Sequence, residues 1–372
     1  MTARARSLTI PPGGFEHIAV IRLSSLGDVI LAESVVRALH TAYPAARITF
    51  WTREEYRDVV RFNPAIFHVR ALEADARKIE DLVSMSAELE DCDLIVDLHG
   101  NAASRVLTFR QSAPTLRSAS YRLRRMRWVH ARWTRPQPAP PALVRYASAL
   151  APLGLGAADP PRLEAGGEAE EWAAAEWAEW GPARVIAVCP GARHFTKRWP
   201  ERHWIECVAS LRERGDAVLM LGLESERRAL AEFEARFVGD ANVRWCVGPL
   251  PRMAALLSRC AAAISGDSGL MHVAAARGIG VVALFGSTVP ELGFAPAGPG
   301  HEVLCRREPC QPCTLHGRPA CPRGHFRCLM ELRPAGVVTA LDRLIERESQ
   351  AYIGAERPID RRETGSLGLP VS

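Results

Sequence analysis

Short apolar runs alternate with longer amphipathic segments along the first half of the chain. A buried strand is predicted at 17–22, followed by a loop at 23–28 and an amphipathic helix at 29–43. Further strands are expected at 48–51 and 94–97, and helical segments around 54–62 and 76–90. This alternation is typical of βαβ units, in which helices cover a parallel sheet.

The second half repeats the same pattern after a connector rich in Pro, Gly and Ala at 151–167 and a Trp-rich helix at 168–180. Its expected strands lie at 185–188, 217–221, 261–264 and 280–285, and its helices at 201–214, 225–237, 251–260 and 271–277. The fold class is therefore α/β, with two Rossmann-like halves and a cleft between them. The predicted domains are 1–165, 166–335 and a C-terminal helix and tail at 336–372.

Composition is that of a soluble globular protein. The 372 residues are 48% hydrophobic, carry a formal charge of +5, and contain no apolar run near the ~20 residues that a membrane span needs. The N-terminal residues 1–12 have no apolar signal core, so an export signal is not expected. Without export, the ten cysteines are expected in a reducing cytoplasm, where thiols do not form disulfides. Only two lysines occur, Lys78 and Lys197, so each deserves examination.

The turn from Gly266 to Gly269, with His272 three residues later, lies between an apolar strand and a helix of small residues. Such a turn falls at the carboxyl end of a parallel strand, where open α/β sheets bind ligands. Backbone N–H groups at the start of the following helix are suited to a phosphate. The alternative is that Asp267 only caps the helix.

Three motifs together resemble glycosyltransferase family 9, the ADP-heptose:lipopolysaccharide heptosyltransferases of the GT-B fold. They are Ser24–Asp28, Thr196–Pro200 and Gly266–His272, and the resemblance covers roughly residues 16–345. It implies an inverting transfer of heptose from ADP-heptose onto the lipopolysaccharide inner core, a Kdo/heptose-lipid A acceptor. It also implies a cytoplasmic enzyme, peripheral on the inner membrane, that requires no cofactor for catalysis.

The resemblance assigns roles to individual residues. Asp28 would be the base that takes the proton of the acceptor hydroxyl, although it also suits a helix N-cap. Lys197, with Thr196, would contact the donor diphosphate and replace a metal ion; the alternative is a solvated surface lysine. The remaining donor-side residues are Glu224 for the ribose, Asp267 for sugar hydroxyls, and Ser268, Gly269 and His272 around the diphosphate. The remaining acceptor-side residues are Ser25, Gly27 and His99, the last of which is equally suited to a structural role.

A basic and aromatic stretch runs from Arg117 to Arg135 in the acceptor half. Arginine clusters bind phosphates and carboxylates with two parallel hydrogen bonds, so Arg124, Arg125 and Arg127 are predicted to bind an anionic acceptor. Tryptophans of the stretch are suited to a membrane interface. No nucleic-acid-binding motif accompanies it, so nucleic acid is not expected as a partner. The alternative is a solvated arginine-rich loop.

Four cysteines near the C-terminus, Cys310, Cys313, Cys321 and Cys328, have the spacing of a thiolate zinc site. The loop that carries them has little apolar content, so a structural zinc would order it. Free or redox-active thiols are the equally weighted alternative.

The sequence argues against two other classes of function, an oxidoreductase and a zinc-containing binding module. A Rossmann oxidoreductase needs a Gly-x-Gly-x-x-Gly turn after its first strand, and residues 23–28 supply one glycine. A zinc-containing binding module would not need all three motifs. Another family 9 transferase with a different nucleotide-sugar donor remains the alternative within the enzyme class.

Overall fold

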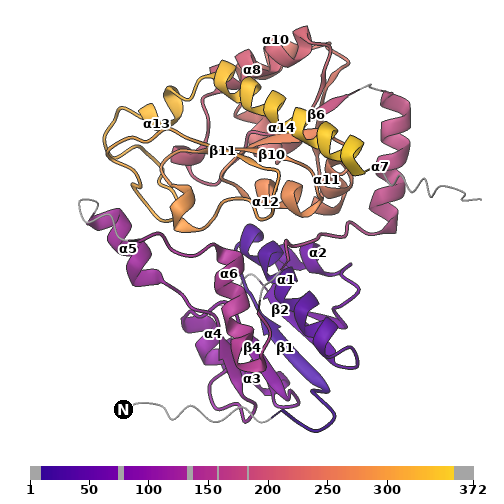
Figure 1. The fold of residues 1–372 in the computed structure, drawn as a ribbon, viewed down its shortest axis with the longest axis vertical. Helices are drawn as coiled ribbons and strands as arrows, with labels where there is room; N and C mark the ends of the chain where they lie inside the picture. Colours follow the sequence, from indigo (N-terminus) through magenta and orange to yellow (C-terminus); the bar gives the residue numbers. More distant parts are fainter. Residues whose placement is uncertain (1–9, 74–78, 132–136, 157–158, 182–183, 356–372) are drawn as a thin grey trace, which may run out of the picture.

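The computed structural model describes residues 10–73, 79–131, 137–156, 159–181 and 184–355. Two lobes face each other, the N-terminal one in indigo to magenta and the C-terminal one in pink to yellow (Figure 1). Lys78, Arg132, Trp133, Arg135 and the Gly/Pro-containing tail after 355 lie outside the described residues.

The N-terminal lobe holds a five-stranded parallel sheet in the order β3-β2-β1-β4-β5. Its strands are β1 (His17–Ile21), β2 (Arg47–Arg53), β3 (His68–Leu72), β4 (Leu94–Asp97) and β5 (Thr115–Arg117). Its helices are α1 (Leu26–Ala42), α2 (Arg57–Val60), α3 (Ile79–Ser86), α4 (Ala102–Leu107), α5 (Arg122–His130) and α6 (Ala142–Ala147). The strand order reverses between β1 and β4, which is where such sheets bind ligands.

The C-terminal lobe holds a six-stranded parallel sheet in the order β11-β10-β9-β6-β7-β8. Its strands are β6 (Val185–Cys189), β7 (Ala217–Gly222), β8 (Val243–Val247), β9 (Ala262–Gly266), β10 (Val281–Phe285) and β11 (Glu302–Cys305). Its helices are α7 (Gly167–Trp180), α8 (Glu201–Glu213), α9 (Glu224–Arg228), α10 (Ala231–Phe237), α11 (Leu250–Leu257), α12 (Gly269–Ala276), α13 (Arg327–Met330) and α14 (Pro334–Ala355). Here the order reverses between β6 and β9, again a ligand-binding position.

The predicted α/β class and the two Rossmann-like halves are confirmed. The pattern missed the short outer strands β3, β5, β8 and β11, whose side chains are less uniformly buried than those of the central strands. The single helix expected at 225–237 is two helices, α9 and α10. The boundary after residue 165 stays a prediction.

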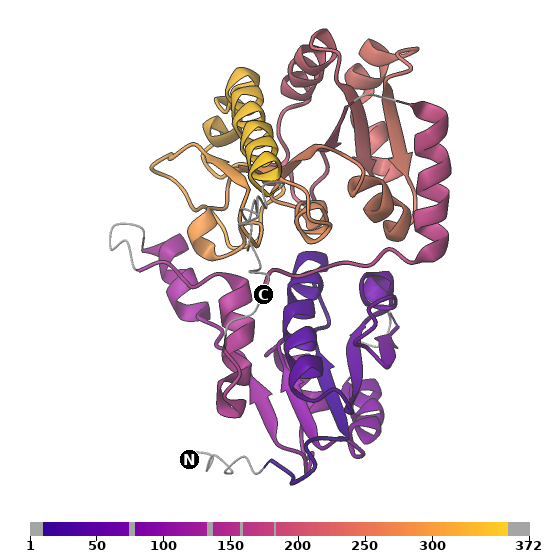
Figure 2. The ribbon, with the colours of Figure 1, turned by 45° about the vertical axis from the view of Figure 1, so that its right-hand side comes forward.

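The lobes are joined where two helices meet end to end. The chain between α6 and α7 runs along the junction, and its Leu163 exchanges hydrogen bonds with Ala276 and Arg277 of the C-terminal lobe (Figure 2). At the start of α1, a Cβ on Gly27 would overlap the His272 ring of α12. At the start of α12, a Cβ on Gly269 would overlap Leu26. Glycine at both positions therefore allows the two helices to approach.

Candidate functional site at the lobe junction

Three of the predicted catalytic and donor-binding residues, Asp28, Lys197 and Asp267, lie near the meeting point of α1 and α12. Asp28 follows β1 and His99 follows β4, so both lie where the strand order of the first sheet reverses. Lys197 follows β6 and Asp267 follows β9, the corresponding position of the second sheet. The two ligand-binding edges thus face each other.

Asp28 is the third residue of α1, and its two carboxylate oxygens have different partners. Oδ2 accepts from Arg22 Nη2 at 2.7 Å, from Ser25 Oγ at 3.0 Å and from Ser25 N at 3.3 Å. Oδ1 accepts from the Tyr146 hydroxyl of α6 at 2.5 Å. Arg22 and these hydrogen bonds outweigh burial and hold the Asp28 pKa far below its usual range. Asp28 is therefore ionised, and among the described residues Oδ1 accepts from Tyr146 alone, which leaves it a lone pair.

His99 lies beside this network. Its backbone N–H donates to Asp97, a buried carboxylate that also pairs with Arg117 at 3.3 Å. Burial and the nearby Arg22 lower the His99 pKa to about 4, so the ring is neutral at pH 7. Its Nδ1 is buried without a hydrogen-bond partner among the described residues. His99 is thus brought to the site, whereas Arg117 is engaged within its own lobe.

On the donor side, Lys197 and Asp267 form an ion pair. Lys197 Nζ lies 2.8 Å from Asp267 Oδ2, and Thr288 Oγ1 donates to the same oxygen at 2.5 Å. Asp267 is only 5% exposed, so its charge depends on these two partners. The lysine is a fixed charge in the site, not a solvated surface residue.

The helix start of α12 supplies further polar groups. Ser268 is its N-cap, and its Oγ lies 3.3 Å from Ser265 Oγ. The His272 ring is buried, and burial lowers its pKa, although Asp267 and Asp28 both act to raise it. His272 therefore lies within electrostatic reach of both carboxylates, and its ring packs against Gly27.

The Thr196 hydroxyl makes its hydrogen bonds inside the protein. It is 1% exposed, and its Oγ1 accepts from Ser287 Oγ at 2.9 Å and from Arg318 N at 2.8 Å. It also donates to Arg318 O. The hydroxyl is used inside the protein, where it ties the Lys197 loop to the segment at 314–318.

A pocket of about 280 Å³ opens next to this site. Its lining includes Tyr56, Arg193, Gly222, Glu226, Ser268 and Gly269. Glu226 lies in it, against Gly191 and Gly222, and accepts from Leu223 N at 2.9 Å. Glu224 does not line the pocket; it pairs with Arg228 on the exposed side of α9.

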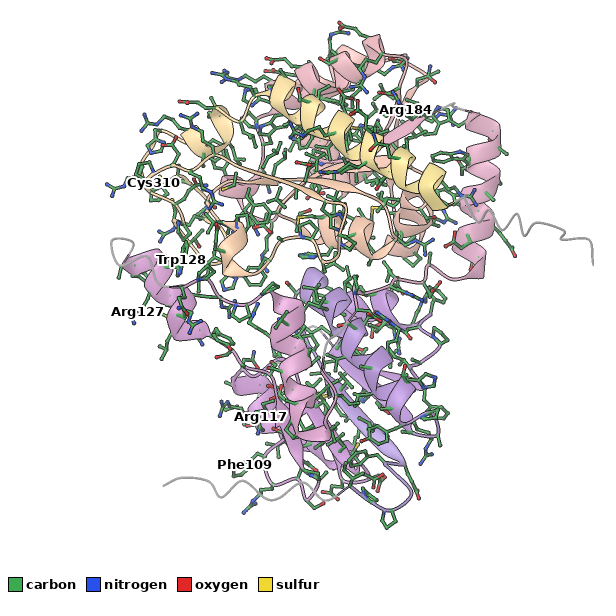
Figure 3. All side chains as sticks on the ribbon, in the orientation of Figure 1. Phe109, Arg117, Arg127, Trp128, Arg184 and Cys310 are labelled. Carbon is green, nitrogen blue, oxygen red and sulfur yellow. The ribbon has the colours of Figure 1, made fainter. Side chains whose placement is uncertain are left out.

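The three predicted acceptor arginines of α5 point in different directions. Arg125 lies over the Phe294 ring of the other lobe, 5.4 Å from its centroid. Arg124 lies over Tyr121 of its own segment. Arg127 is exposed at the outer edge of the helix, far from Arg117 (Figure 3). Only Arg125 of the three reaches the junction.

The four cysteines lie in the segment between β11 and α14, with Cys328 in α13. Cys310 lies at the side of the C-terminal lobe from which α5 protrudes below (Figure 3). Burial, and then the thiols of Cys313, Cys310 and Cys321, raise the Cys328 pKa to about 12, which places the four side chains near one another. The Cys310 Sγ lies 3.7 Å from His325 Nε2. Within the described ranges, no three such side chains are arranged around a common metal position. Structural zinc therefore stays a prediction.

Sequence reasoning missed several residues of the site, namely Arg22, Tyr146, Glu226 and Thr288. Arg22 ends the first apolar strand, and an arginine there next to Asp28 is a recognisable signal. The sequence around Tyr146 and Thr288 contains no such signal. Each side chain reaches its carboxylate, Asp28 or Asp267, only in the folded chain.

The family model of glycosyltransferase family 9 (heptosyltransferase) matches residues 83–320. The chain belongs to glycosyltransferase family 9. Lipopolysaccharide heptosyltransferase 2 of Salmonella typhimurium and that of Escherichia coli are each 30% identical over 170 residues, 44% of this chain. The match spans about half the length of these curated relatives, 47% of each.

Solved structures of the family share the fold over most of both chains. A family 9 glycosyl transferase of Veillonella parvula superposes with a TM-score of 0.74 at 21% identity, covering 89% of this chain and 98% of that one. The E. coli ADP-heptose lipopolysaccharide heptosyltransferase II superposes with a TM-score of 0.67 at 21% identity, covering 90% and 99%. The predicted GT-B fold is confirmed.

Among the helices that the structure describes, none is both long and apolar enough to cross a bilayer.

Replacing Lys197 with Ala is expected to weaken ADP binding by roughly 10- to 100-fold, the effect of losing one hydrogen bond to a charged group. The loss also leaves Asp267 buried without its cation, which would repel a diphosphate. Isothermal titration calorimetry without a divalent ion measures the ADP affinity. Glu224→Gln, outside the pocket, serves as the control with unchanged affinity. Equal ADP affinity in Lys197→Ala, or a requirement for Mg²⁺, contradicts the prediction.

If the four cysteines bind structural zinc, protein purified without added zinc contains about one equivalent of the metal, because a tetrahedral thiolate site takes a single ion. The Cys310→Ser variant should lose both this zinc and part of the thermal stability. Elemental analysis measures the zinc content, and a melting curve measures the thermal stability. Zinc-free protein whose melting temperature is the same in both forms would reduce the cluster to ordinary thiols.

Proposed function

We propose that this family 9 chain is an inverting glycosyltransferase that moves heptose from ADP-heptose onto the anionic inner core of lipopolysaccharide. The observation that carries the proposal is the position of Asp28 opposite the Lys197–Asp267 pair, at the reversal points of two facing sheets. A general base on one lobe and a phosphate-binding cation on the other are the two groups that such a transfer needs. The printed names of the relatives support this choice of donor and acceptor.

The donor nucleotide occupies the pocket beside α12. Glu226 accepts hydrogen bonds from the ribose hydroxyls, a role that passes to it from Glu224 because of its place in the pocket lining. The diphosphate lies against Lys197 and the backbone N–H groups at the start of α12. Lys197 is already held by Asp267, so it stabilises the leaving group without moving.

Transfer occurs in one displacement. The acceptor hydroxyl oxygen forms a bond to the anomeric carbon, the bond from that carbon to the diphosphate oxygen breaks, and ADP leaves. A single displacement inverts the configuration at the anomeric carbon. The hydroxyl proton goes to Oδ1 of Asp28, the oxygen with a free lone pair. Because its pKa is low, Asp28 is a weak base, and it takes the proton late, after bond formation has made the hydroxyl acidic.

The exposed side of α5 faces the inner membrane. Leu123 is 79% exposed, next to the exposed Arg122. An apolar side chain flanked by arginine suits an anionic lipid surface, where each basic residue near the surface contributes about 1 kcal/mol. The acceptor is anchored in that surface, so α5 would hold the junction close to it.

The function is tested by incubating purified protein with ADP-heptose and with other nucleotide sugars, each with truncated core acceptors. Mass spectrometry identifies the product, and NMR of the new linkage gives the anomeric configuration. We expect a heptosylated product of inverted configuration from ADP-heptose alone. Transfer from a different nucleotide sugar, or retention of configuration, would replace the proposal.

The Asp28→Asn variant is expected to lose turnover by on the order of 10²–10⁴-fold, because an amide keeps the size but cannot take a proton. Its ADP affinity should barely change. Asp58→Asn, on the surface of the same lobe, is the matched control with parental turnover. Steady-state kinetics and calorimetry measure both; near-normal turnover in Asp28→Asn would remove the residue from the role.

The parent protein is expected to cosediment with vesicles that contain roughly 30% phosphatidylglycerol, and less so at high salt. Leu123→Asp should lower the bound fraction several-fold. Val238→Asp, at an 82% exposed apolar position of the other lobe, is the matched control and should bind like the parent. Equal loss in both variants would argue against a specific role of α5.

A further inference from the structure

Three of the nine tryptophans lie on α7, the helix that runs along one edge of the C-terminal lobe (Figures 1 and 2). Trp172, Glu176 and Trp180 follow one another at intervals of four, so they share a face of the helix, and Trp177 lies beside Glu176. The fully buried positions of α7 are alanines instead. The three indoles are only half-buried, so each keeps apolar surface that the fold does not cover.

These side chains line a cavity of about 160 Å³ between α7, the edge strand β8 and α11. The buried part of its lining is apolar and includes Leu219, Cys246 and Leu256. The lining also includes the exposed side chains of Glu176 and Arg252, so the cavity opens to solvent. A cavity of roughly 150 Å³ is large enough for one benzene ring. The space therefore suits a single six-membered ring.

Two arginines of this lining lie over the tryptophans. The guanidinium carbon of Arg252 is 4.7 Å from the Trp172 centroid, and that of Arg244 is 5.1 Å from the Trp180 centroid. A ring face attracts a cation but accepts no conventional hydrogen bond. Within the described ranges, neither arginine has a carboxylate partner, and Glu176 has no cation partner. Guanidinium N–H groups and carboxylate oxygens therefore remain available to a ligand.

The two kinds of charge lie close together at the bottom of the cavity. Burial raises the pKa of the Cys246 thiol to about 11, while Arg252 acts to lower this pKa and Glu176 to raise it. A cationic ligand would meet two arginines here, and an anionic one would meet Glu176. A flat hydrocarbon would stack on the indoles but would leave the charged groups without partners. An uncharged ring with apolar faces and hydroxyl groups around its edge matches all of them.

We infer that this cavity binds one pyranose sugar unit, at a site separate from the proposed nucleotide pocket. The C–H groups of the sugar ring lie against the electron-rich indole faces of α7. Its hydroxyls donate to Glu176 and accept from Arg244 and Arg252, in hydrogen bonds strengthened by the charge of the protein group. The linings of the two cavities share Gly248, in the turn after β8. The inference uses no residue of the lobe junction, so it does not rest on the proposed function.

The test titrates methyl α-mannopyranoside and methyl β-glucopyranoside into the full chain by saturation-transfer NMR, with saturating ADP to fill the nucleotide pocket. We expect at least one glycoside to bind the parent. Trp180→Ala removes a stacking surface and Glu176→Ala removes an acceptor, and each should weaken binding roughly tenfold or more, as expected for one hydrogen bond to a charged group. Trp128→Ala on α5 and Glu179→Ala on α7, both outside the cavity, are the matched controls with parental affinity.

Glu176 is exposed, so its replacement is expected to leave the fold intact. Weaker glycoside binding in Glu176→Ala, with unchanged melting temperature and ADP affinity, supports the site. No binding of either glycoside to the parent, or parental affinity in both Trp180→Ala and Glu176→Ala, would overturn it. Binding of benzoate, a flat anion of one ring, in place of the glycosides would overturn the choice of a sugar. Heptose transfer is measured separately, so either proposal can fail without the other.

Discussion

The close approach of the α1 and α12 helix starts determines how the two lobes face each other. It exists because Gly27 and Gly269 carry no side chain, which leaves room for His272 and Leu26. Each helix start also marks the reversal point of its sheet, so this one contact brings two ligand-binding edges together. An alanine at either glycine would push the edges apart and with them Asp28 and Lys197. The junction therefore depends on a side chain of each helix packing directly on the bare glycine backbone of the other.

Charge is distributed across the junction in fixed pairs. Asp28 is held by Arg22 and Tyr146, and Lys197 is held by Asp267, which also accepts a hydrogen bond from Thr288. Because these groups are already positioned, they need not reorganise when charge develops during the reaction. The exception is the pair Arg125 and Arg145, which lie over the Phe294 ring and form no ion pair with any carboxylate that the structure describes.

The sequence predicted those parts of the site that depend on local structure. Asp28 and the Gly266–Gly269 turn were recognisable because glycine and carboxylate directly follow apolar strands. Glu224 and Glu226 differ by two positions on one short helix, and only the fold shows which one faces the pocket. Thr196 is bonded to Arg318, 122 residues away, so its internal role had no local signal. Tyr146 and Arg145 lie in the short helix α6, and their importance comes from what packs against them.

The two backbone hydrogen bonds from Ala139 and Ala142 to the 291–293 segment have a consequence for any separation of the lobes. They attach the start of α6 to the C-terminal lobe, although α6 belongs to the N-terminal one. If the lobes separate while these bonds hold, α6 is drawn away from α1 and Tyr146 leaves Asp28. Asp28 would keep Arg22 and Ser25 but lose the hydroxyl that holds its second oxygen. The attachment would thus couple any separation of the lobes to the hydrogen bonding of this carboxylate.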